Sequence, residues 1–193
     1  MQGVAVGGED FDEALFRAKL WDVFDLNHQP AQLGGLVSRR SAAVRALSND
    51  AVLSALATAS RGGVLLREIL YGGFAYELFQ AIERAKIQLS TAAQAGISFD
   101  RPGLRLDVPV TRTEFESLIR QDIDAVFEQL TRALQQAELD PTDVDLVVRT
   151  GGSSSIPLFV DRLKEMFPGR VVERPPFDTI ATGLGLHARK VWT

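Results

Sequence analysis

The chain has 193 residues, which is enough for one large domain or two small ones. Hydrophobic residues make up 46% and charged residues 24%, so the chain can bury a core and its composition is not that of a disordered protein. The net charge of −4 gives no support to nucleic-acid binding, and the absence of cysteine excludes disulfides and thiolate metal sites.

Two further classes of function find no support in the sequence. His28 and His187 are the only histidines, which excludes a histidine-rich metal site. No apolar run approaches the roughly 20 residues of a membrane span, and the N-terminus lacks a basic-then-apolar signal pattern. We therefore expect no membrane association and a cytoplasmic location.

The N-terminal segment predicts a strand, a turn and a helix. Val4 and Val6 are typical of a strand end, and apolar residues at helical spacing predict a helix over residues 10–24. Gly7 and Gly8 lie between the two. The sequence thus predicts a turn with no side chains directly before a helix.

The next part of the chain predicts a loop followed by helices. Residues 25–40 contain Asn, Pro and Gly and are typical of a loop, whereas residues 41–59 predict a helix that breaks at 61–63. Residues 64–71 are apolar and fit either a helix or a strand. After a second glycine pair, apolar residues at three- and four-residue spacing predict a helix over 74–89.

The middle of the chain predicts a β-hairpin and a long helix. Residues 97–100 and 104–108 each alternate apolar and polar side chains, which is typical of strands with one face in water. Thr111 and Glu114 have the spacing of a capping box at a helix start. Apolar residues over 115–134 then form the clearest amphipathic stripe of the chain.

The C-terminal part alternates short strands with helices. Residues 144–149 predict a strand buried on both faces, and after the GGSSS turn (151–155) a helix is expected over 158–167. Residues 171–172 predict a short strand and 178–190 a last helix. This alternation predicts the α/β class with a mixed β-sheet.

The GGSSS turn raises a question of function. Glycine permits backbone angles forbidden to other residues and lets a ligand reach the chain, while the following helix presents unpaired amides. The serines then either contact a ligand or cap the helix. On this motif alone a tight turn with a helix cap is the more common explanation, since no longer phosphate-binding motif is present.

Polar side chains on the predicted 74–89 helix also leave two interpretations open. Glu83, Lys86 and Ser90 share one helix face, which alone indicates a face in water. Asp10 and Asp12 fit a cation site, but acids in a first helical turn more often complement the helix dipole.

Four segments in order resemble the second lobe of the ATPase domain of the 70-kilodalton heat-shock protein family. They are VGGEDFDEAL (6–15), IERAKIQLS (82–90), 109–119 and 145–167. The resemblance is weak over 25–75. It implies an actin-like ATPase fold, related to sugar kinases and to ribonuclease H, in which two lobes close over ATP or ADP.

The resemblance assigns roles to the GGSSS turn and its neighbours. Gly151, Gly152 and Ser153 would lie against the adenosine and its phosphate, with Ile156 near the base. Ser155 is counted with the site because it occupies a position where the family has an arginine.

The resemblance also assigns roles near the N-terminus and on the 74–89 helix. Gly8, with Gly7 before it, would approach the ribose. Glu83 and Lys86 would hold the ribose hydroxyls, and Ser90 would make a polar contact to the base.

The sequence departs from the family at the base. The family clamps adenine between two arginines, whereas this chain has Ile87 and Ser155 at those positions. The acid that precedes the last helix in the family falls on Phe177, with Asp178 one place later. A divergent member with an altered base preference is expected.

The resemblance implies a domain division and partners. A larger nucleotide-facing subdomain would comprise 1–25 and 111–193, and a smaller outer subdomain 26–110 would bear a docking surface for a nucleotide-exchange partner. The chain is expected to be one lobe of a longer protein whose own first lobe is its partner. Mg²⁺ would bind only in the complete two-lobed protein, so no catalytic or metal-binding residue is assigned here and no ATP hydrolysis by the chain alone is expected.

Two other functions compete with a nucleotide-gripping lobe. A protein-interaction module that keeps the fold but binds nucleotide weakly or not at all is favoured by the missing arginines. A different actin-like enzyme, such as a sugar kinase, is disfavoured by GGSSSIP and ERAKIQLS.

Overall fold

The structure, a computed structural model, describes most of the chain. The described residues are 6–28, 38–40, 60–101, 104–173 and 178–191. The strand predicted at Val4, the helix predicted over 41–59 and the side chain of Phe177 lie outside these ranges.

The chain forms two compact units. One comprises Gly7–Arg120, and the other comprises Met1–Val6 together with Gln121–Thr193. Each unit is described by itself below. The predicted division into subdomains 1–25 with 111–193 and 26–110 stays a prediction.

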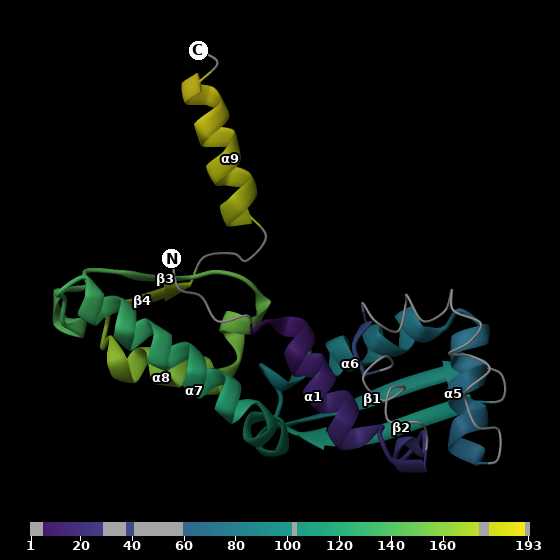
Figure 1. Ribbon diagram of the computed structural model, residues 1–193. Coiled ribbons are helices and arrows are strands. Elements are labelled where there is room, and N and C mark those ends of the chain that lie inside the picture. The colour runs from purple at the N-terminus through teal and green to yellow at the C-terminus, as the bar shows by residue number, and fades with distance from the viewer. Residues whose placement is uncertain (1–5, 29–37, 41–59, 102–103, 174–177, 192–193) are drawn as a thin grey trace. The chain divides into compact units, whose positions relative to one another are not determined.

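The unit of residues 7–120 combines helices with a β-hairpin (Figure 1). Its elements are α1 (Gly8–Lys19), α5 (Arg61–Tyr71), α6 (Ala75–Leu89), β1 (Gln94–Arg101) and β2 (Leu104–Thr111). The two strands pair in antiparallel fashion, α6 packs against β1, and α1 packs against α6. The hairpin and the helix over 74–89 are therefore confirmed.

Aromatic side chains fill the core of this unit. The ring of Phe16 on α1 stacks on Phe24 and on Phe79 of α6, with centroids 5.9 and 5.8 Å apart. On the hairpin, Ile97 and Val110 are fully buried. The polar side chains at alternate positions along each strand face water. Alternation with period two thus places one face of the hairpin against the helices.

The first helix is shorter than predicted. Apolar spacing indicated a helix over 10–24, but α1 ends at Lys19 and a turn follows, with a 3₁₀ turn at Leu26–His28. Leu20 and Phe24 nevertheless remain fully buried. Apolar periodicity therefore did not mark where the helix ends, because buried residues continue into the turn that follows it.

The capping box at the start of α7 (Arg112–Gln136) is confirmed. The Thr111 amide donates to Glu114 Oε2 at 2.8 Å, and the Glu114 amide donates to Thr111 Oγ1 at 3.2 Å. The hydrogen bond from the Thr111 backbone, together with those from the side chains of Lys19 and Thr111, lowers the pKa of Glu114 to about 2. Glu114 thus stays ionised at neutral pH and satisfies amides that a helix start leaves unpaired.

The other unit contains a parallel strand pair. Strands β3 (Val147–Arg149) and β4 (Val171–Glu173) pair with each other and are connected through α8 (Pro157–Met166), and α9 (Asp178–Val191) follows. Residues of α7 from position 121 onward also belong to this unit.

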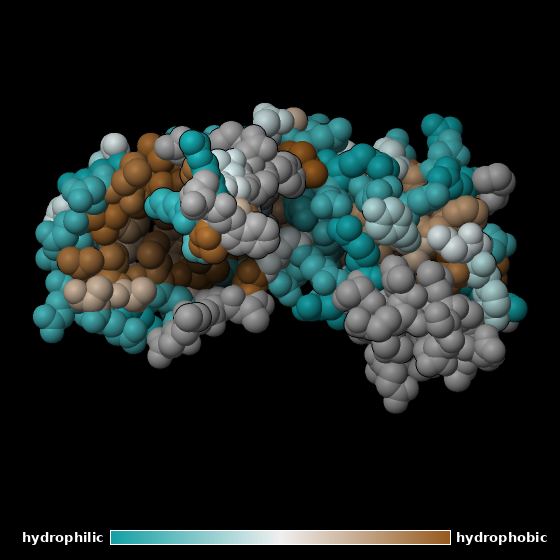
Figure 2. Space-filling view, turned by 90° about the horizontal axis from the view of Figure 1, so that it is seen from above, coloured by the Kyte–Doolittle hydropathy of each residue, from teal (hydrophilic) through white to brown (hydrophobic). Residues whose placement is uncertain are grey.

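The strand predicted over 144–149 is not buried on both faces. Leu146 and Val148 are 53% and 46% exposed, and Val172 is 36% exposed. Figure 2 shows apolar side chains gathered on the surface of this unit. Among the described residues, β3 and β4 form a sheet of two strands. Because their apolar side chains remain partly exposed, this parallel pair lacks the cover on both faces that parallel sheets usually have.

The predicted mixture of helices and strands is confirmed. The described residues hold two separate two-stranded sheets, one antiparallel and one parallel, and not one mixed sheet. Among these residues, no helix has both the length and the apolar composition needed to cross a bilayer.

Gly62 and Gly63 lie in the first turn of α5, and the break predicted there after the 41–59 helix involves residues outside the described ranges. Ser60 caps α5 by accepting a hydrogen bond from the Gly63 amide at 3.0 Å. A Cβ on Gly62 would lie 2.6 Å from the Phe24 carbonyl carbon and 2.7 Å from the Val23 oxygen. Gly62 therefore lets the backbone of α5 approach the chain that leaves α1.

We expect Gly62→Ala to lower the free energy of unfolding by about 1–3 kcal/mol, because its Cβ overlaps backbone atoms that cannot move independently. Gly183→Ala is the matched control, since a Cβ on this helical glycine would meet nothing within 4 Å and alanine favours helix by about 1 kcal/mol. Urea denaturation of both variants measures the difference. Equal stability of Gly62→Ala and the wild type would contradict the packing argument.

Candidate functional site

The GGSSS turn has a backbone that requires glycine at its first position. Gly151 has φ +86° and ψ 151°, a conformation that residues with a side chain rarely adopt. Gly152–Ser155 then form a 3₁₀ turn, and α8 begins only at Pro157. Ile156 is the N-cap residue of α8 and makes no side-chain cap hydrogen bond. The helix predicted over 158–167 is confirmed within one residue at each end, whereas the alternative that a serine caps it is not what the structure shows.

Arg149 on β3 and Ser154 hold the turn in shape. Ser154 Oγ donates to the Gly151 carbonyl at 2.7 Å. The Arg149 guanidinium donates to the Ser154 carbonyl and forms an ion pair with Glu173 on β4 at 3.1 Å. The Arg149 side chain is only 9% exposed. Sequence reasoning missed Arg149, although a cation inside a mostly apolar strand was a signal that it has a specific partner.

The backbone of the turn is open to a ligand. A Cβ placed on Gly151 or on Gly152 would meet no atom within 4 Å. Ser153 and Ser155 are half-buried, whereas Ile156 is 2% exposed and belongs to the core. The turn therefore presents bare peptide groups and two partly accessible hydroxyls.

The first glycine pair is open as well, but for a different reason. Gly7 has φ −152° and ψ −170°, an extended conformation that any residue adopts, and a Cβ there would meet nothing within 4 Å. The backbone angles at this position therefore do not require glycine. Gly8 is the first residue of α1, and Val6 before the pair is not in a strand. The Gly7 amide donates to Asp10 Oδ2 at 2.7 Å.

Lys86 on α6 reaches the first glycine pair. Its Nζ donates to the Gly8 carbonyl at 3.0 Å and lies 2.7 Å from Asp12 Oδ1. The Lys86 side chain is 12% exposed and that of Asp12 is 2% exposed. The structure thus brings Gly8 and Lys86 together, and Lys86 does not lie on a face in water.

Asp12 is a buried carboxylate between two cations. Its second oxygen, Oδ2, lies 3.6 Å from the Arg40 guanidinium, which also donates to Glu83 Oε2 at 2.9 Å. Burial raises the pKa of the Asp12 carboxyl, and the nearby Lys86 ammonium opposes this effect. Asp12, Glu83, Lys86 and Arg40, hereafter the four-charge cluster, therefore join α1 to α6. Neither of the two roles weighed for Asp12, a cation ligand or a helix-dipole partner, describes this contact.

Residues 38–40 were expected to be part of a loop, and their contacts were missed. Ser38 is fully buried and donates to Glu13 Oε1 at 3.0 Å. Arg39 pairs with Asp10 at 2.8 Å and also with Glu13. Although burial acts in the opposite direction, hydrogen bonds from Arg17 and Ser38 lower the pKa of Glu13. These contacts fix residues 38–40 on α1, next to the four-charge cluster.

Two further residues of interest lie near the end of α6. Ser90 is the half-buried C-cap residue of the helix, and Ile87 is 60% exposed. Gly7, Gly8, Glu83, Lys86 and Ser90 all belong to the unit of residues 7–120, whereas the GGSSS turn belongs to the other unit. The convergence of both groups on one nucleoside stays a prediction.

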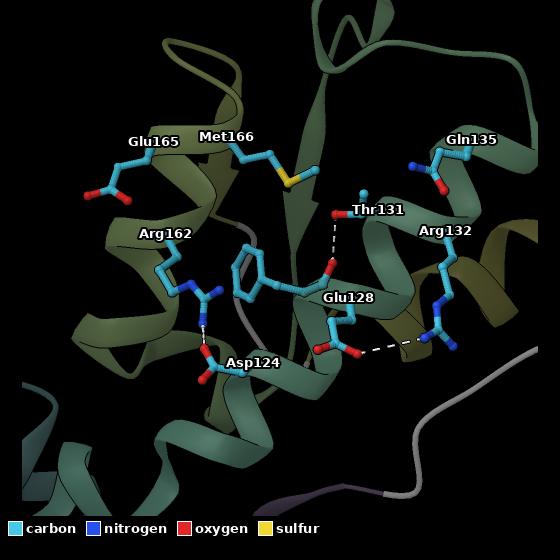
Figure 3. Close-up of a pocket in the computed structure, with 9 residues that line it drawn as sticks. Asp124, Glu128, Thr131, Arg132, Gln135, Arg162, Glu165 and Met166 are labelled. Carbon is cyan, nitrogen blue, oxygen red and sulfur yellow. Dashed lines mark hydrogen bonds and ion pairs between the residues drawn. The ribbon is translucent and has the colours of Figure 1, made fainter.

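A groove between α7 and α8 contains none of the predicted residues (Figure 3). It has a volume of about 940 Å³. Its charged side chains largely satisfy one another, since Arg162 pairs with Asp124 and lies over the ring of Phe127 at 4.5 Å. Within the described part of the chain, no group of three or more acidic or histidine side chains is arranged to hold a metal ion.

Comparison with known proteins shows a clear similarity. The sequence model of the Hsp70 protein family matches residues 74–187. The chain is 32% identical over 120 residues to the chaperone protein DnaK of Thermosipho melanesiensis and 31% identical over 121 residues to that of Thermotoga maritima. It is 33% identical over 119 residues to the chaperone protein dnaK1 of Synechocystis sp.. Each match covers 58% of this chain but only 20%, 20% and 17% of the relative, so the chain matches about a fifth of the length of these curated relatives.

We expect Gly151→Ala to destabilise the fold by about 1–2 kcal/mol, because a side chain disfavours the positive φ at this position. Gly152→Ala is the matched control. A Cβ at Gly152 would also meet no atom within 4 Å, but Gly152 does not have a positive φ. Chemical denaturation followed by circular dichroism checks this. Equal effects of the two substitutions would show that the angle is not what requires glycine.

Proposed function

Because this chain belongs to the Hsp70 protein family, we propose that it is an ATP- or ADP-binding lobe of a chaperone-like ATPase and that it grips the nucleoside. The observation that carries the proposal is the contact between Lys86 and the Gly8 carbonyl, which joins two of the predicted ribose-binding elements. These elements are far apart in the sequence and come from different helices.

The residues of the four-charge cluster fit a ribose. Adjacent hydroxyls of a ribose both donate and accept hydrogen bonds, and Glu83 offers an acceptor where Lys86 offers a donor. The Glu83 side chain is 39% exposed, so it remains accessible to a ligand while Arg40 contacts one of its oxygens. The open backbone at Gly7 gives a ligand room to approach.

The GGSSS turn fits a polar or anionic group. The peptide groups of the turn carry no side chain at Gly151 or Gly152, so no side chain blocks the approach of a ligand there. Ser153 and Ser155 add hydroxyl groups. On this proposal the turn contacts the adenosine and its phosphate. Gly8, Glu83 and Lys86 hold the ribose, and Ser90 contacts the base.

The proposal includes the actin-like lobe and a second lobe outside this chain. ATP hydrolysis would then depend on both lobes and on Mg²⁺, which stabilise the charge of the transferring phosphoryl group. This lobe would bind the nucleoside and rotate as a body on closing. A cytoplasmic location and a docking surface for a nucleotide-exchange partner on residues 26–110 are part of the same proposal.

A protein-interaction module with weak or lost nucleotide binding is the second candidate. Ile87, at a position where the family has an arginine, is 60% exposed and supplies no cation to stack on a base. Loss of guanidinium stacking costs about 0.5–2 kcal/mol per residue. The two candidates differ in whether the protein binds ADP at all.

We expect the chain to bind ADP saturably, and Gly152→Arg to weaken binding at least about tenfold because the new side chain fills the open approach to the turn. Gly183→Arg, which adds the same side chain at another open position, is the control and should leave affinity unchanged. Isothermal titration calorimetry with ADP measures both, and circular dichroism confirms the fold. Absence of ADP binding by the chain and by a longer protein that contains it would favour the interaction module.

We expect no ATP turnover by the 193-residue chain alone, because the groups that stabilise phosphoryl transfer would come from the other lobe and from Mg²⁺ bound there. Phosphate release measured with ATP and Mg²⁺ tests this. Turnover that Gly152→Arg abolishes would contradict the assignment of hydrolysis to a two-lobed protein.

A further inference from the structure

Arg40 occupies a position in the four-charge cluster that sequence reasoning did not assign to any role. One guanidinium nitrogen, Nη2, donates to Glu83 Oε2 at 2.9 Å and lies 3.6 Å from Asp12 Oδ2. The Arg40 side chain is 30% exposed, whereas that of Asp12 is 2% exposed. Arg40 therefore lies between an interior carboxylate and a carboxylate that a ligand can reach.

This arrangement limits the freedom of Glu83. An isolated glutamate on a helix surface samples several rotamers, but a guanidinium that binds one of its oxygens holds the carboxylate in one orientation. Oε2 accepts from Arg40, which leaves Oε1 as the oxygen available to another donor. Arg40 also offsets the negative charge of Glu83, which would otherwise repel an anionic ligand.

Asp12 in turn keeps Arg40 in place. Its Oδ1 pairs with Lys86 and its Oδ2 faces Arg40, so one buried carboxylate contacts both cations. An unpaired charge in such a buried position is strongly unfavourable, and the orientation of the two cations is therefore coupled. Glu83 and Lys86 are thus held by one common partner on α1.

We propose that Arg40 is a positioning residue that sets the selectivity of this site for ribonucleotides over 2′-deoxyribonucleotides. The inference rests on the proposed function, in which Glu83 accepts from the ribose hydroxyls. A fixed acceptor loses a hydrogen bond when the 2′-hydroxyl is absent, whereas a mobile carboxylate turns toward whichever hydroxyl remains or toward water. Selectivity therefore depends on how firmly Glu83 is held.

Arg39 provides a matched control. It is adjacent to Arg40 and carries the same charge, but it pairs with Asp10 and Glu13 on the first turns of α1. Replacing either arginine by methionine removes one positive charge from the same short segment. If Arg40 acted only on stability or through long-range electrostatics, the two substitutions would change the preference for ADP over 2′-deoxy-ADP equally.

The test compares the dissociation constants of ADP and 2′-deoxy-ADP by isothermal titration calorimetry. The full 193-residue chain is used as wild type, Arg40→Met and Arg39→Met. We expect the wild type and Arg39→Met to prefer ADP about tenfold, as loss of one hydrogen bond to a charged group implies. We expect the preference in Arg40→Met to fall to about twofold. If Arg40→Met does not fold, Arg40→Lys replaces it in the test. Arg40→Lys keeps the charge but not the planar guanidinium, so we expect its preference for ADP to lie between about twofold and about tenfold.

Each outcome has a distinct meaning. If the wild type binds ADP and the preference is unchanged in Arg40→Met and Arg40→Lys, the role of Arg40 is refuted and the proposed function stands. An equal loss of preference in Arg39→Met also refutes it. If neither the chain nor a longer protein that contains it binds either nucleotide, the proposed function fails and the role of Arg40 fails with it.

Discussion

The buried carboxylate of Asp12 is the constraint on which the arrangement around α1 and α6 depends. An ionised carboxylate inside a protein is tolerated only when cations or donors surround it, and here Lys86 and Arg40 do so. Lys86 also binds the Gly8 carbonyl, and Arg40 also binds Glu83. The two cations that neutralise Asp12 therefore also order the turn at Gly8 and the carboxylate of Glu83. The groups proposed to hold the ribose, Gly8, Glu83 and Lys86, are thus ordered by contacts that satisfy one buried charge.

Much of the fold was predictable because local chemistry determines it. The hairpin follows from strict alternation, and the start of α7 follows from Thr111 and Glu114 at capping-box spacing. Predictions failed where tertiary contacts outweigh local pattern. Gly62 was noted only as part of a helix break, and its close packing against the backbone of residues 23–25 was not foreseen. The strand at 147–149 was predicted to be buried from its apolar residues, although burial depends on neighbours that a short segment does not specify.

The candidate site was predictable only in part, for a related reason. Family resemblance pointed to Gly8, Glu83 and Lys86, and the structure brings Lys86 to Gly8. Of the residues that hold them, Asp12 was considered only as a cation ligand or a helix-dipole partner and Arg40 was missed, because ion pairs between distant segments leave no periodic signal. Arg149 was missed in the same way, since its partners are a carbonyl of the GGSSS turn and Glu173 on β4, and neither contact leaves a pattern in the sequence.

The separation of Lys86 and Gly8 by 78 positions has a consequence for the order of folding. The strands of the hairpin pair from Arg101 with Leu104 outward, a local closure of the kind that takes roughly 1–10 μs. Docking of α1 on α6 must instead close a long loop, which slows it. Early in folding α6 would pack on β1 before α1 docks on α6. The Asp12 carboxylate would therefore stay hydrated until α1 docks, and only that late step would remove its water.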